Sequence, residues 1–196
     1  MEYNSKGVLN SFFRTLNLLL TPKREWERIA LESNTTKELF RSFAFPLIAF
    51  CAIIAASGTY IYSKELWVAV VKLFVDFMAL NLGLYCAAKL TILISPNFQL
   101  VIKSELVFKL VIYSASAFCI FHGLAQLFSP FSFLNQICLL FEMYFIRILW
   151  LGTLSILSIA NNKRPGFVVM ASLLILVLPL LFERLFSILF RFPLTI

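Results

Sequence analysis

The chain has 196 residues, of which 61% are apolar and only 14% are charged, and its mean hydropathy is +0.90. A typical soluble domain is roughly 45–50% apolar and about 25% charged, and a globule of this size has too much surface to hide the excess. Composition therefore excludes an ordinary soluble enzyme, a disordered chain and a fibrous protein, and it indicates a polytopic membrane protein. The net charge of +7 fits the Lys and Arg that membrane proteins concentrate on the cytoplasmic side, so we expect no nucleic-acid partner.

Residues 1–41 precede the first long apolar run and form a predicted cytoplasmic arm. The arm opens with apolar residues at helical spacing, which are Val8, Leu9, Phe12, Phe13, Leu16, Leu19 and Leu20. This pattern predicts an amphipathic helix that lies in the plane of the lipid headgroups. A second helix is expected to begin at Pro22 with Thr21 as its N-cap. Trp26 and Ile29 are predicted to anchor that helix at the membrane interface.

Residues 42–196 contain five apolar runs, each long enough for a bilayer-spanning helix of about 20 residues. The predicted spans are 42–63, 66–94, 106–128, 132–160 and 167–190. Short connections with turn residues make neighbouring helices antiparallel. The predicted fold class is therefore all-α, a bundle of five transmembrane helices with a short amphipathic arm. Thr35 and Glu38 have capping-box spacing for the helix that enters the membrane, and Pro46 is expected to kink the first span.

The distribution of Lys and Arg between the connections predicts the orientation of the bundle. One side carries Lys6, Arg14, Lys23, Arg24, Arg28, Lys37, Arg41, Lys103, Lys163 and Arg164. The other side carries only Lys64 and Arg191. We therefore expect the N-terminus in the cytoplasm and the C-terminus on the opposite side of the membrane.

Several polar and ionisable residues lie inside the predicted spans, where they are costly and usually face the bundle interior. This candidate intramembrane polar network consists of Lys72, Asp76, His122, Gln126, Glu142, Arg147, Glu183 and Arg184. Lys72 and Asp76 are four residues apart and are expected to pair within one helix, and Gln126 is placed to hydrogen-bond His122. The three strong bases equal the three acids in number, as in a mutually neutralised network. Two interpretations stay open: a path for ions, protons or substrate, or a structural cluster in which Lys72 and Arg184 extend toward the outer headgroups.

Small residues at four-residue spacing mark two predicted packing stripes, which are Ala79, Gly83 and Ala87 in the second span and Ala115, Cys119 and Gly123 in the third. Such stripes let helix backbones approach closely in lipid, so these two spans are expected to pair directly. The chain has no nucleotide-binding, metalloprotease or serine-hydrolase motif. Its four cysteines form no CxxC pair. We therefore expect no enzymatic activity, no cofactor and no bound metal.

Four segments resemble the Yip domain family, the Ypt/Rab-interacting-protein type. Leu19–Ala30, with Pro22 and Trp26, resembles the L-x-P-x-x-x-W-x-x-I motif that opens this family's domain, and Ala44–Leu47 follows with Pro46 where the family has a proline at its first span. Lys109–Ser114, with Tyr113, resembles the Y-S segment of the third span, although Ala115–Ala117 stand where the family often has a proline. Tyr144–Gly152 resembles the Y…G segment of the fourth span.

The resemblance implies a five-helix membrane protein with a cytoplasmic N-terminus, and in eukaryotic members it implies binding of Rab-type GTPases. The short cytoplasmic arm, which lacks a long acidic or Pro-rich extension, argues against GTPase binding by this chain. It resembles the short bacterial-type members, which implies the bacterial cytoplasmic (inner) membrane.

Two functional hypotheses follow from these patterns. The first is a non-enzymatic scaffold of the Yip type, which organises the membrane or binds a membrane-protein partner or a second copy of itself. The alternative is an ion- or proton-coupled transporter or channel for small solutes that uses Asp76, His122 and Glu142.

Overall fold

The computed structural model describes residues 2–100, 103–157 and 159–190, with side chains from residue 11 onward. Within these ranges the chain forms helices joined by short turns and contains no strand. The side chains of Lys6, Val8 and Leu9, and the whole of Arg191, for which predictions were made, lie outside this description.

Eleven helical elements follow one another along the described chain. They are α1 (Glu2–Leu20), α2 (Pro22–Ala30), α3 (Thr36–Leu39), η1 (Phe40–Ala44), α4 (Phe45–Ser63), α5 (Leu66–Ile94), η2 (Ser95–Phe98), α6 (Ser104–Leu127), α7 (Ser132–Glu142), α8 (Tyr144–Ile156) and α9 (Arg164–Leu189). Five segments are long and apolar enough to cross a membrane, which are Thr36–Ser63, Leu66–Phe98, Ser104–Leu127, Ser132–Ile156 and Arg164–Leu189. The prediction of five apolar helices is therefore confirmed.

The first of these segments begins six residues before the predicted span, so the predicted boundary at residue 41 falls inside a helix. Thr35 caps α3 as predicted, because its hydroxyl accepts from the Glu38 amide and the Glu38 carboxylate accepts from the Thr35 amide. The helix then widens into the π-helical turn η1 just before Pro46. Pro46 has no N–H to donate to the carbonyl of Ser42, and that carbonyl accepts the hydroxyl of Ser11 on α1 instead.

The fourth predicted span, 132–160, is not one continuous helix. It is interrupted at Met143 between α7 and α8, and α8 ends at Ile156. The interruption directly follows Glu142, whose side chain is turned into the bundle and is only 3% exposed.

Helix α6 lies at the centre of the bundle. In its most apolar stretch 83% of residues are buried inside the protein, against 33–50% in the other four segments. It packs against α4, α5, α7, α8 and α9. A run of small and polar residues from Ser114 to Ala117 lets its neighbours approach on every side, and all four are fully buried.

The two small-residue stripes pack differently from the prediction. α5 and α6 are in contact, as expected, but the glycines face other helices. A Cβ at Gly83 would lie 2.5 Å from Cα of Pro179 on α9, and one at Gly123 would lie 2.9 Å from the carbonyl oxygen of Cys51 on α4. Ala79, Ala87 and Ala115 are buried as well. Gly83 therefore lets α9 pack closely against α5, and Gly123 lets α4 pack closely against α6. The prediction had instead paired the two stripes with each other.

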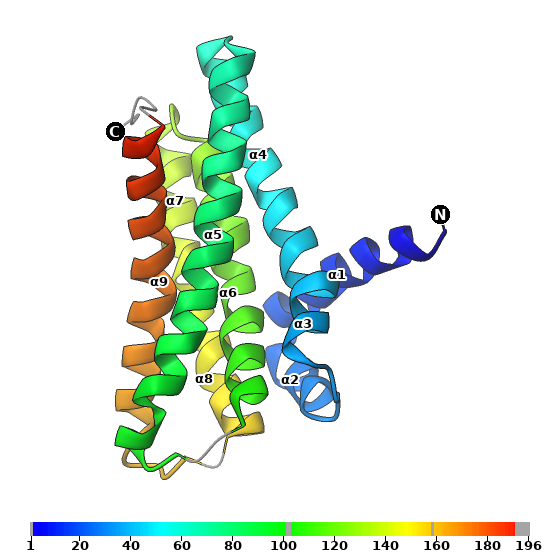
Figure 1. Ribbon diagram of the computed structural model, residues 1–196, viewed down its shortest axis with the longest axis vertical. Coiled ribbons are helices and arrows are strands. Elements are labelled where there is room, and N and C mark those ends of the chain that lie inside the picture. The colour runs from blue at the N-terminus through cyan, green and yellow to red at the C-terminus, as the bar shows by residue number, and fades with distance from the viewer. Residues whose placement is uncertain (1, 101–102, 158, 191–196) are drawn as a thin grey trace.

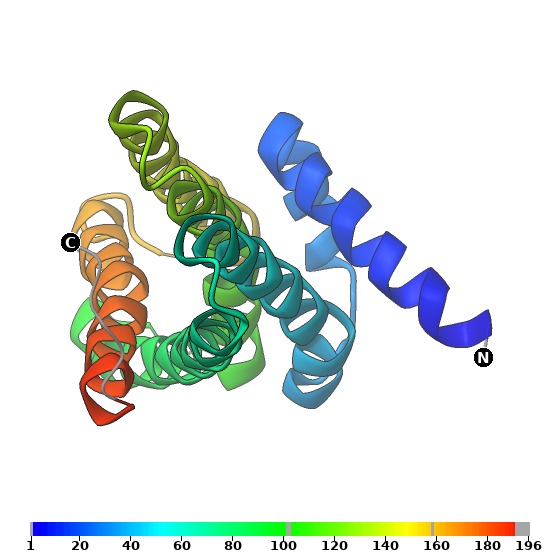
Figure 2. The same ribbon diagram turned by 90° about the horizontal axis from the view of Figure 1, so that it is seen from above.

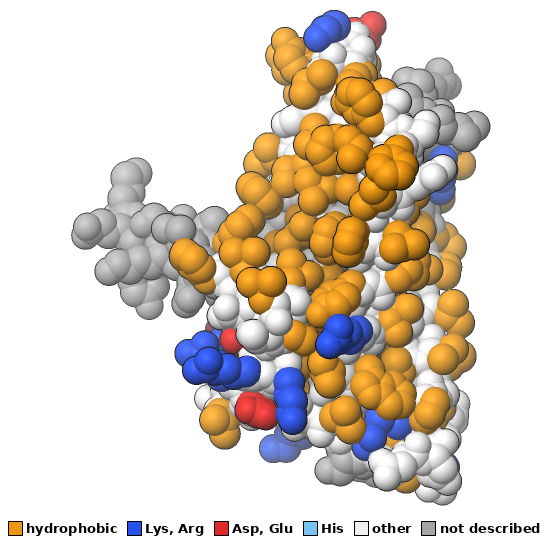
Figure 3. Space-filling view, turned by 180° about the vertical axis from the view of Figure 1, so that it is seen from behind, with side chains coloured by type: hydrophobic (Ala, Val, Ile, Leu, Met, Phe, Trp, Pro, Cys, Tyr) orange, Lys and Arg blue, Asp and Glu red, His pale blue; other side chains and the backbone are white. Residues whose placement is uncertain are grey.

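Helices α1 and α2 cross the bundle rather than joining it. α2 packs against α8, and α1 projects sideways past α4 (Figures 1 and 2). We call the end of the bundle that carries α2, α3 and the α5–α6 and α8–α9 connections the arm end, and the opposite end the far end. Apolar side chains cover most of the flank shown in Figure 3, and charged side chains gather at its arm end with a small group at the far tip.

The close approach of Gly83 to Pro179 predicts that even a methyl group at position 83 destabilises the fold. Replacing Gly83 by Ala is expected to lower the stability of the detergent-solubilised protein by about 1–3 kcal/mol, because the added methyl meets backbone that has no room to move. Gly166→Ala is the matched control, since its Cβ would approach only the ring edge of Phe98, at 3.2 Å. The measurement is the thermal unfolding midpoint of both variants, and equal midpoints would contradict the packing described.

Candidate functional site

Ionisable side chains from four helices meet in the half of the bundle nearer the far end. Lys72 and Asp76 come from α5, His122 from α6, Glu142 from the end of α7 and Glu183 from α9. At a rise of ~1.5 Å per residue they lie about 8–15 Å along their helices from that end. All are buried except Glu183, whose side chain is 17% exposed.

Glu183 joins the separate parts of this group. The Lys72 amino group lies 2.8 Å from Oδ1 of Asp76 and 2.8 Å from Oε1 of Glu183. His122 bridges two carboxylates, with Nδ1 3.1 Å from Oε1 of Glu142 and Nε2 3.2 Å from Oε2 of Glu183. The predicted pairing of Lys72 with Asp76 is confirmed. The ion pairs between helices depend on how α9 packs, which periodicity does not reveal.

Three details of the predicted network are corrected by these contacts. Gln126 donates to Oε1 of Glu183 at 3.3 Å rather than to His122. Lys72 is 6% exposed and turned inward, so it does not extend to the headgroups. Arg184 is exposed and makes no ion pair with any described residue.

Arg147 lies outside the group as well. Its guanidinium sits 5.6 Å from the ring centre of Tyr144, and it lines a surface pocket with Lys23 and Arg24 of the arm. The side chain is exposed near the arm end, because α8 carries the chain away from the far end after the break at Met143.

The charges in the group consequently do not balance in the way the sequence suggested. Without Arg147 and Arg184, three carboxylates face Lys72 and His122. Even with both of these bases charged, one negative charge is left over, and Oδ2 of Asp76 has no hydrogen-bond partner among the described residues. Burial of an uncompensated charge is costly. One proton or one monovalent cation would complete the neutralisation. In the described part of the chain no group of His, Cys, Asp and Glu has the arrangement to hold a metal ion.

A second polar cluster, which the sequence patterns did not predict, fastens the arm to the bundle. Arg14 on α1 lies 3.2 Å from Oε1 of Glu25, forms an ion pair with Glu32 and donates to the hydroxyl of Tyr113 on α6 at 2.8 Å. We call Arg14, Glu25, Glu32 and Tyr113 the arm clamp. Burial opposes the charge of Arg14, but the hydrogen bond to Glu32 and the nearby charges outweigh burial and raise the pKa of Arg14 above its ordinary value.

The available signal for the clamp was the position of Glu25, which lies on the same face of α2 as Pro22 and Ile29. Arg14 lies on the same face of α1 as Leu18, which is 0% exposed. In the sequence alone, Arg14 looked like one of several solvated charges.

The residues of the Yip-like motifs gather beside this clamp. Trp26 is 0% exposed, and its Nε1 donates to the carbonyl of Ile148 on α8 at 2.9 Å. Its ring meets Tyr113 edge to face at 6.1 Å, and it lies against Gly152, where an added Cβ would fall 2.6 Å from Cζ2. The hydroxyl of Tyr144 donates to the carbonyl of Leu19 at 3.0 Å.

Trp26 and Ile29 are therefore packed in protein, both 0% exposed, and the predicted role of these side chains as anchors in the headgroups is wrong. An amphipathic helix buries its apolar face against whatever apolar surface is adjacent. For α2 that surface is α8.

Comparison of the chain with protein-family models, with curated proteins and with solved structures gave no match. The described fold is that of an all-helical protein with five helices of membrane-spanning length and composition. The likeness to the Yip family rests on the sequence motifs and stays a prediction.

The buried ion pairs predict that the stability of the fold depends on the charge of Lys72 but not on that of Arg184. Lys72→Met leaves Asp76 without its cation and Glu183 with only His122 as a basic partner, and is expected to destabilise the detergent-solubilised protein by about 3–5 kcal/mol. Arg184→Met removes the same charge one residue from Glu183 but outside the group, and is expected to stay within about 0.5 kcal/mol of the wild type. Chemical or thermal unfolding of the two variants gives the comparison. A similar loss in both would show that net charge rather than pairing matters.

Proposed function

We propose that this chain is a non-enzymatic, multi-pass integral membrane protein of the Yip type that organises the bilayer through its helix α1. In this proposal the arm end faces the cytoplasm, the C-terminus lies across the membrane, and the membrane is the cytoplasmic (inner) membrane of a bacterium. The direct partner of α1 is the lipid bilayer. Contact with another membrane protein or a second copy of the chain is compatible with this role, and GTPase binding is not part of it.

The observation that carries the proposal is an apolar face of α1 that the protein leaves uncovered. Four large side chains lie within one ~100° sector of the helix and are exposed, which are Phe12 (38%), Phe13 (60%), Leu16 (39%) and Leu20 (78%). The opposite sector carries Ser11, Arg14, Thr15 and Leu18 and faces the bundle. A helix with one face fastened and the other apolar and free is suited to lie in the headgroup layer.

The arm clamp supports the same role because it fixes the direction in which α1 projects. Arg14 is held by two carboxylates and by the Tyr113 hydroxyl, and Trp26 locks α2 onto α8. The segments that resemble Yip motifs supply Trp26, Tyr113 and Gly152, and these residues meet at this one place. A rigidly mounted helix transmits force between bilayer and bundle, whereas a loosely tethered one does not.

The proposal predicts that position 13 is shielded by lipid. Phe13→Cys and the matched control Leu31→Cys, which replaces a residue that is 89% exposed on the same arm, are made in a Cys86→Ser background, because the other three cysteines are buried. Inverted membrane vesicles are then treated with a charged maleimide. Cys at position 13 is expected to react at least about tenfold more slowly than Cys at position 31, since the apolar face of such a helix sits below the headgroups.

The proposed effect of α1 on the bilayer is measured separately, as the diameter of proteoliposomes prepared at a fixed protein-to-lipid ratio. Phe13→Asp combined with Leu20→Asp is expected to remove any effect of the protein on diameter, while Leu31→Asp keeps it. Equal maleimide rates at positions 13 and 31 in vesicles would refute the insertion of α1.

An alternative function is favoured by the excess of carboxylates near the far end. Asp76, Glu142 and Glu183 outnumber Lys72 and His122, and ionisable residues inside a membrane mark ion and proton pathways. A protein that exchanges one bound proton or cation across this group would be an ion- or proton-coupled transporter or channel.

The alternative predicts a measurable flux. Proteoliposomes with an internal pH-sensitive dye and an imposed pH or sodium gradient are expected to equilibrate faster than protein-free vesicles. Asp76→Asn is expected to slow this equilibration about tenfold or more, in the range of effects for groups that transfer protons directly, and Arg184→Met is expected to leave it unchanged. A flux that Asp76→Asn does not alter, or the lack of any flux, rules the alternative out.

A further inference from the structure

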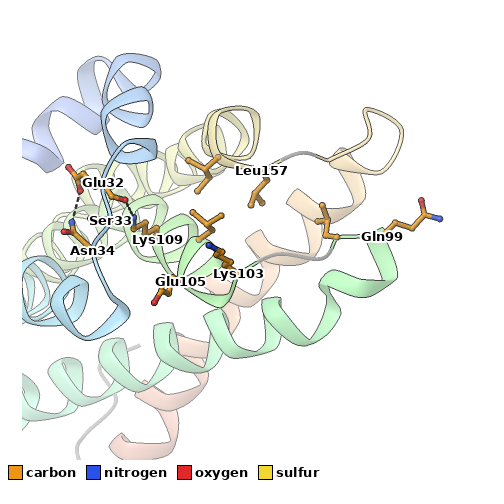
Figure 4. A pocket seen from close by; sticks show the side chains of 11 residues that line it. Glu32, Ser33, Asn34, Gln99, Lys103, Glu105, Lys109 and Leu157 are labelled. Carbon is orange, nitrogen blue, oxygen red and sulfur yellow. Dashed lines mark hydrogen bonds between the residues drawn. The ribbon is translucent and has the colours of Figure 1, made fainter.

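A cavity of about 700 Å³ opens at the arm end between four parts of the chain. They are the α2–α3 connection with Ser33 and Asn34, the residues Gln99 and Leu100 after η2, the start of α6 from Lys103 to Lys109, and the end of α8 at Ile156 and Leu157. Figure 4 shows Lys103 and Lys109 between the connection that carries Glu32 and Asn34 and the side chain of Leu157. None of these residues belongs to the group around Glu183 or to the exposed face of α1.

Lys109 is the unusual residue of this cavity. It is only 3% exposed, and the hydrogen bond described for its amino group goes to the backbone carbonyl of Glu32. Among the described residues no carboxylate forms an ion pair with it. The carboxylate of Glu32 is occupied by Arg14 and by the side-chain amide of Asn34. Lys72 and Arg14, by comparison, each have two carboxylate partners.

A buried ammonium without a paired anion is unfavourable by several kcal/mol, so Lys109 lacks a negatively charged partner. Lys103, which is exposed, brings a second amino group to the same cavity. Two glutamates also line the cavity: Glu32, whose carboxylate pairs with Arg14, and Glu105, which makes no ion pair within the described chain. Two lysines against one free glutamate leave the cavity positive.

The start of α6 adds to this positive potential. Lys103 is the N-cap residue, and no side chain accepts a hydrogen bond from the first turn. The first amide groups of a helix of this length carry a partial positive charge and bind anions such as phosphate. The cavity thus combines two amino groups with space beside the positive end of the α6 helix dipole.

The apolar residues of the cavity indicate that an anion bound there would carry an apolar group. Leu100, Leu106, Ile156 and Leu157 give the cavity an apolar side, which suits the glycerol and first acyl carbons of a phospholipid. Basic pockets between helices on the cytoplasmic side are typical sites for anionic lipid headgroups.

We propose that the cavity formed by Lys103, Lys109, the first turn of α6 and the α2–α3 connection is a phosphate-binding site for the headgroup of an anionic phospholipid. Lys109 pairs with the phosphate from inside the protein, and Lys103 closes over it from the surface. This goes beyond the role of α1 and does not depend on it.

The test measures stabilisation of the purified full chain in neutral detergent micelles. Phosphatidylglycerol and phosphatidylcholine are titrated in one arm, and potassium phosphate against potassium chloride at equal ionic strength in the other. Phosphatidylglycerol is expected to raise the unfolding midpoint and phosphatidylcholine is not. Lys103→Gln and Lys109→Gln are each expected to weaken the apparent affinity for phosphatidylglycerol about tenfold or more, as loss of one charged hydrogen bond does.

Lys37→Gln is the matched control, because it removes one exposed positive charge from the same end of the protein without touching the cavity. Since Lys109 is buried, Lys103→Gln decides the matter if Lys109→Gln does not fold.

A response to phosphatidylglycerol alone identifies a lipid headgroup, and a response to inorganic phosphate as well supports phosphate recognition with either source. An equal midpoint shift in wild type and Lys103→Gln, or an equal loss in Lys37→Gln, overturns the proposal. Maleimide protection at position 13 is measured separately and is expected to be unchanged in Lys103→Gln.

Discussion

The structure depends on the burial of α6 and on the charges that this central helix must neutralise. Nearly all of α6 is enclosed by other helices, so each polar group on it needs a partner from the protein. Tyr113 near the middle of α6 meets Arg14 of the arm, and His122 nearer its C-terminal end meets Glu142 and Glu183. The cost of an unpaired charge in an apolar interior is several kcal/mol, which is enough to select one arrangement of the surrounding helices over others.

The two clusters that contact α6, one through Tyr113 and one through His122, constrain different elements. At the far end Glu183 connects α9 to α5 and α6 through Lys72 and His122, and the close approach of Gly83 to Pro179 brings α9 near enough for this contact. At the arm end the arm clamp and Trp26 hold α1 and α2 across the bundle. The cluster around Glu183 lies inside the bundle and has one negative charge more than its positive charges. The arm clamp, by contrast, holds α1 so that its apolar face points away from the bundle. This difference is why the two proposed functions draw on opposite ends of the molecule.

Lys109 differs from Tyr113 and His122 on α6, because it has no partner of opposite charge among the described residues. It lies one helical turn before Tyr113 on the same buried helix, yet its charge has no carboxylate partner among the described residues. The neighbouring carboxylate of Glu32 is bound to Arg14, so the clamp that orders the arm also leaves Lys109 without a carboxylate partner. Arm docking and the proposed phosphate site are in this way linked through a single residue.

The sequence by itself determined the elements: five apolar helices, the capping box at Thr35 and the pairing of Lys72 with Asp76 all follow from composition and from spacing along one helix. Tertiary structure alone decided which helices meet. It placed Gly83 against α9, excluded Arg147 and Arg184 from the far-end group, turned Trp26 into the protein and assembled the clamp on Arg14. The physical reason is that helix formation and apolar length are local properties, whereas ion pairs between helices depend on packing contacts between residues tens of positions apart. In a chain that is apolar on nearly all helix faces, periodicity gives little information about those contacts.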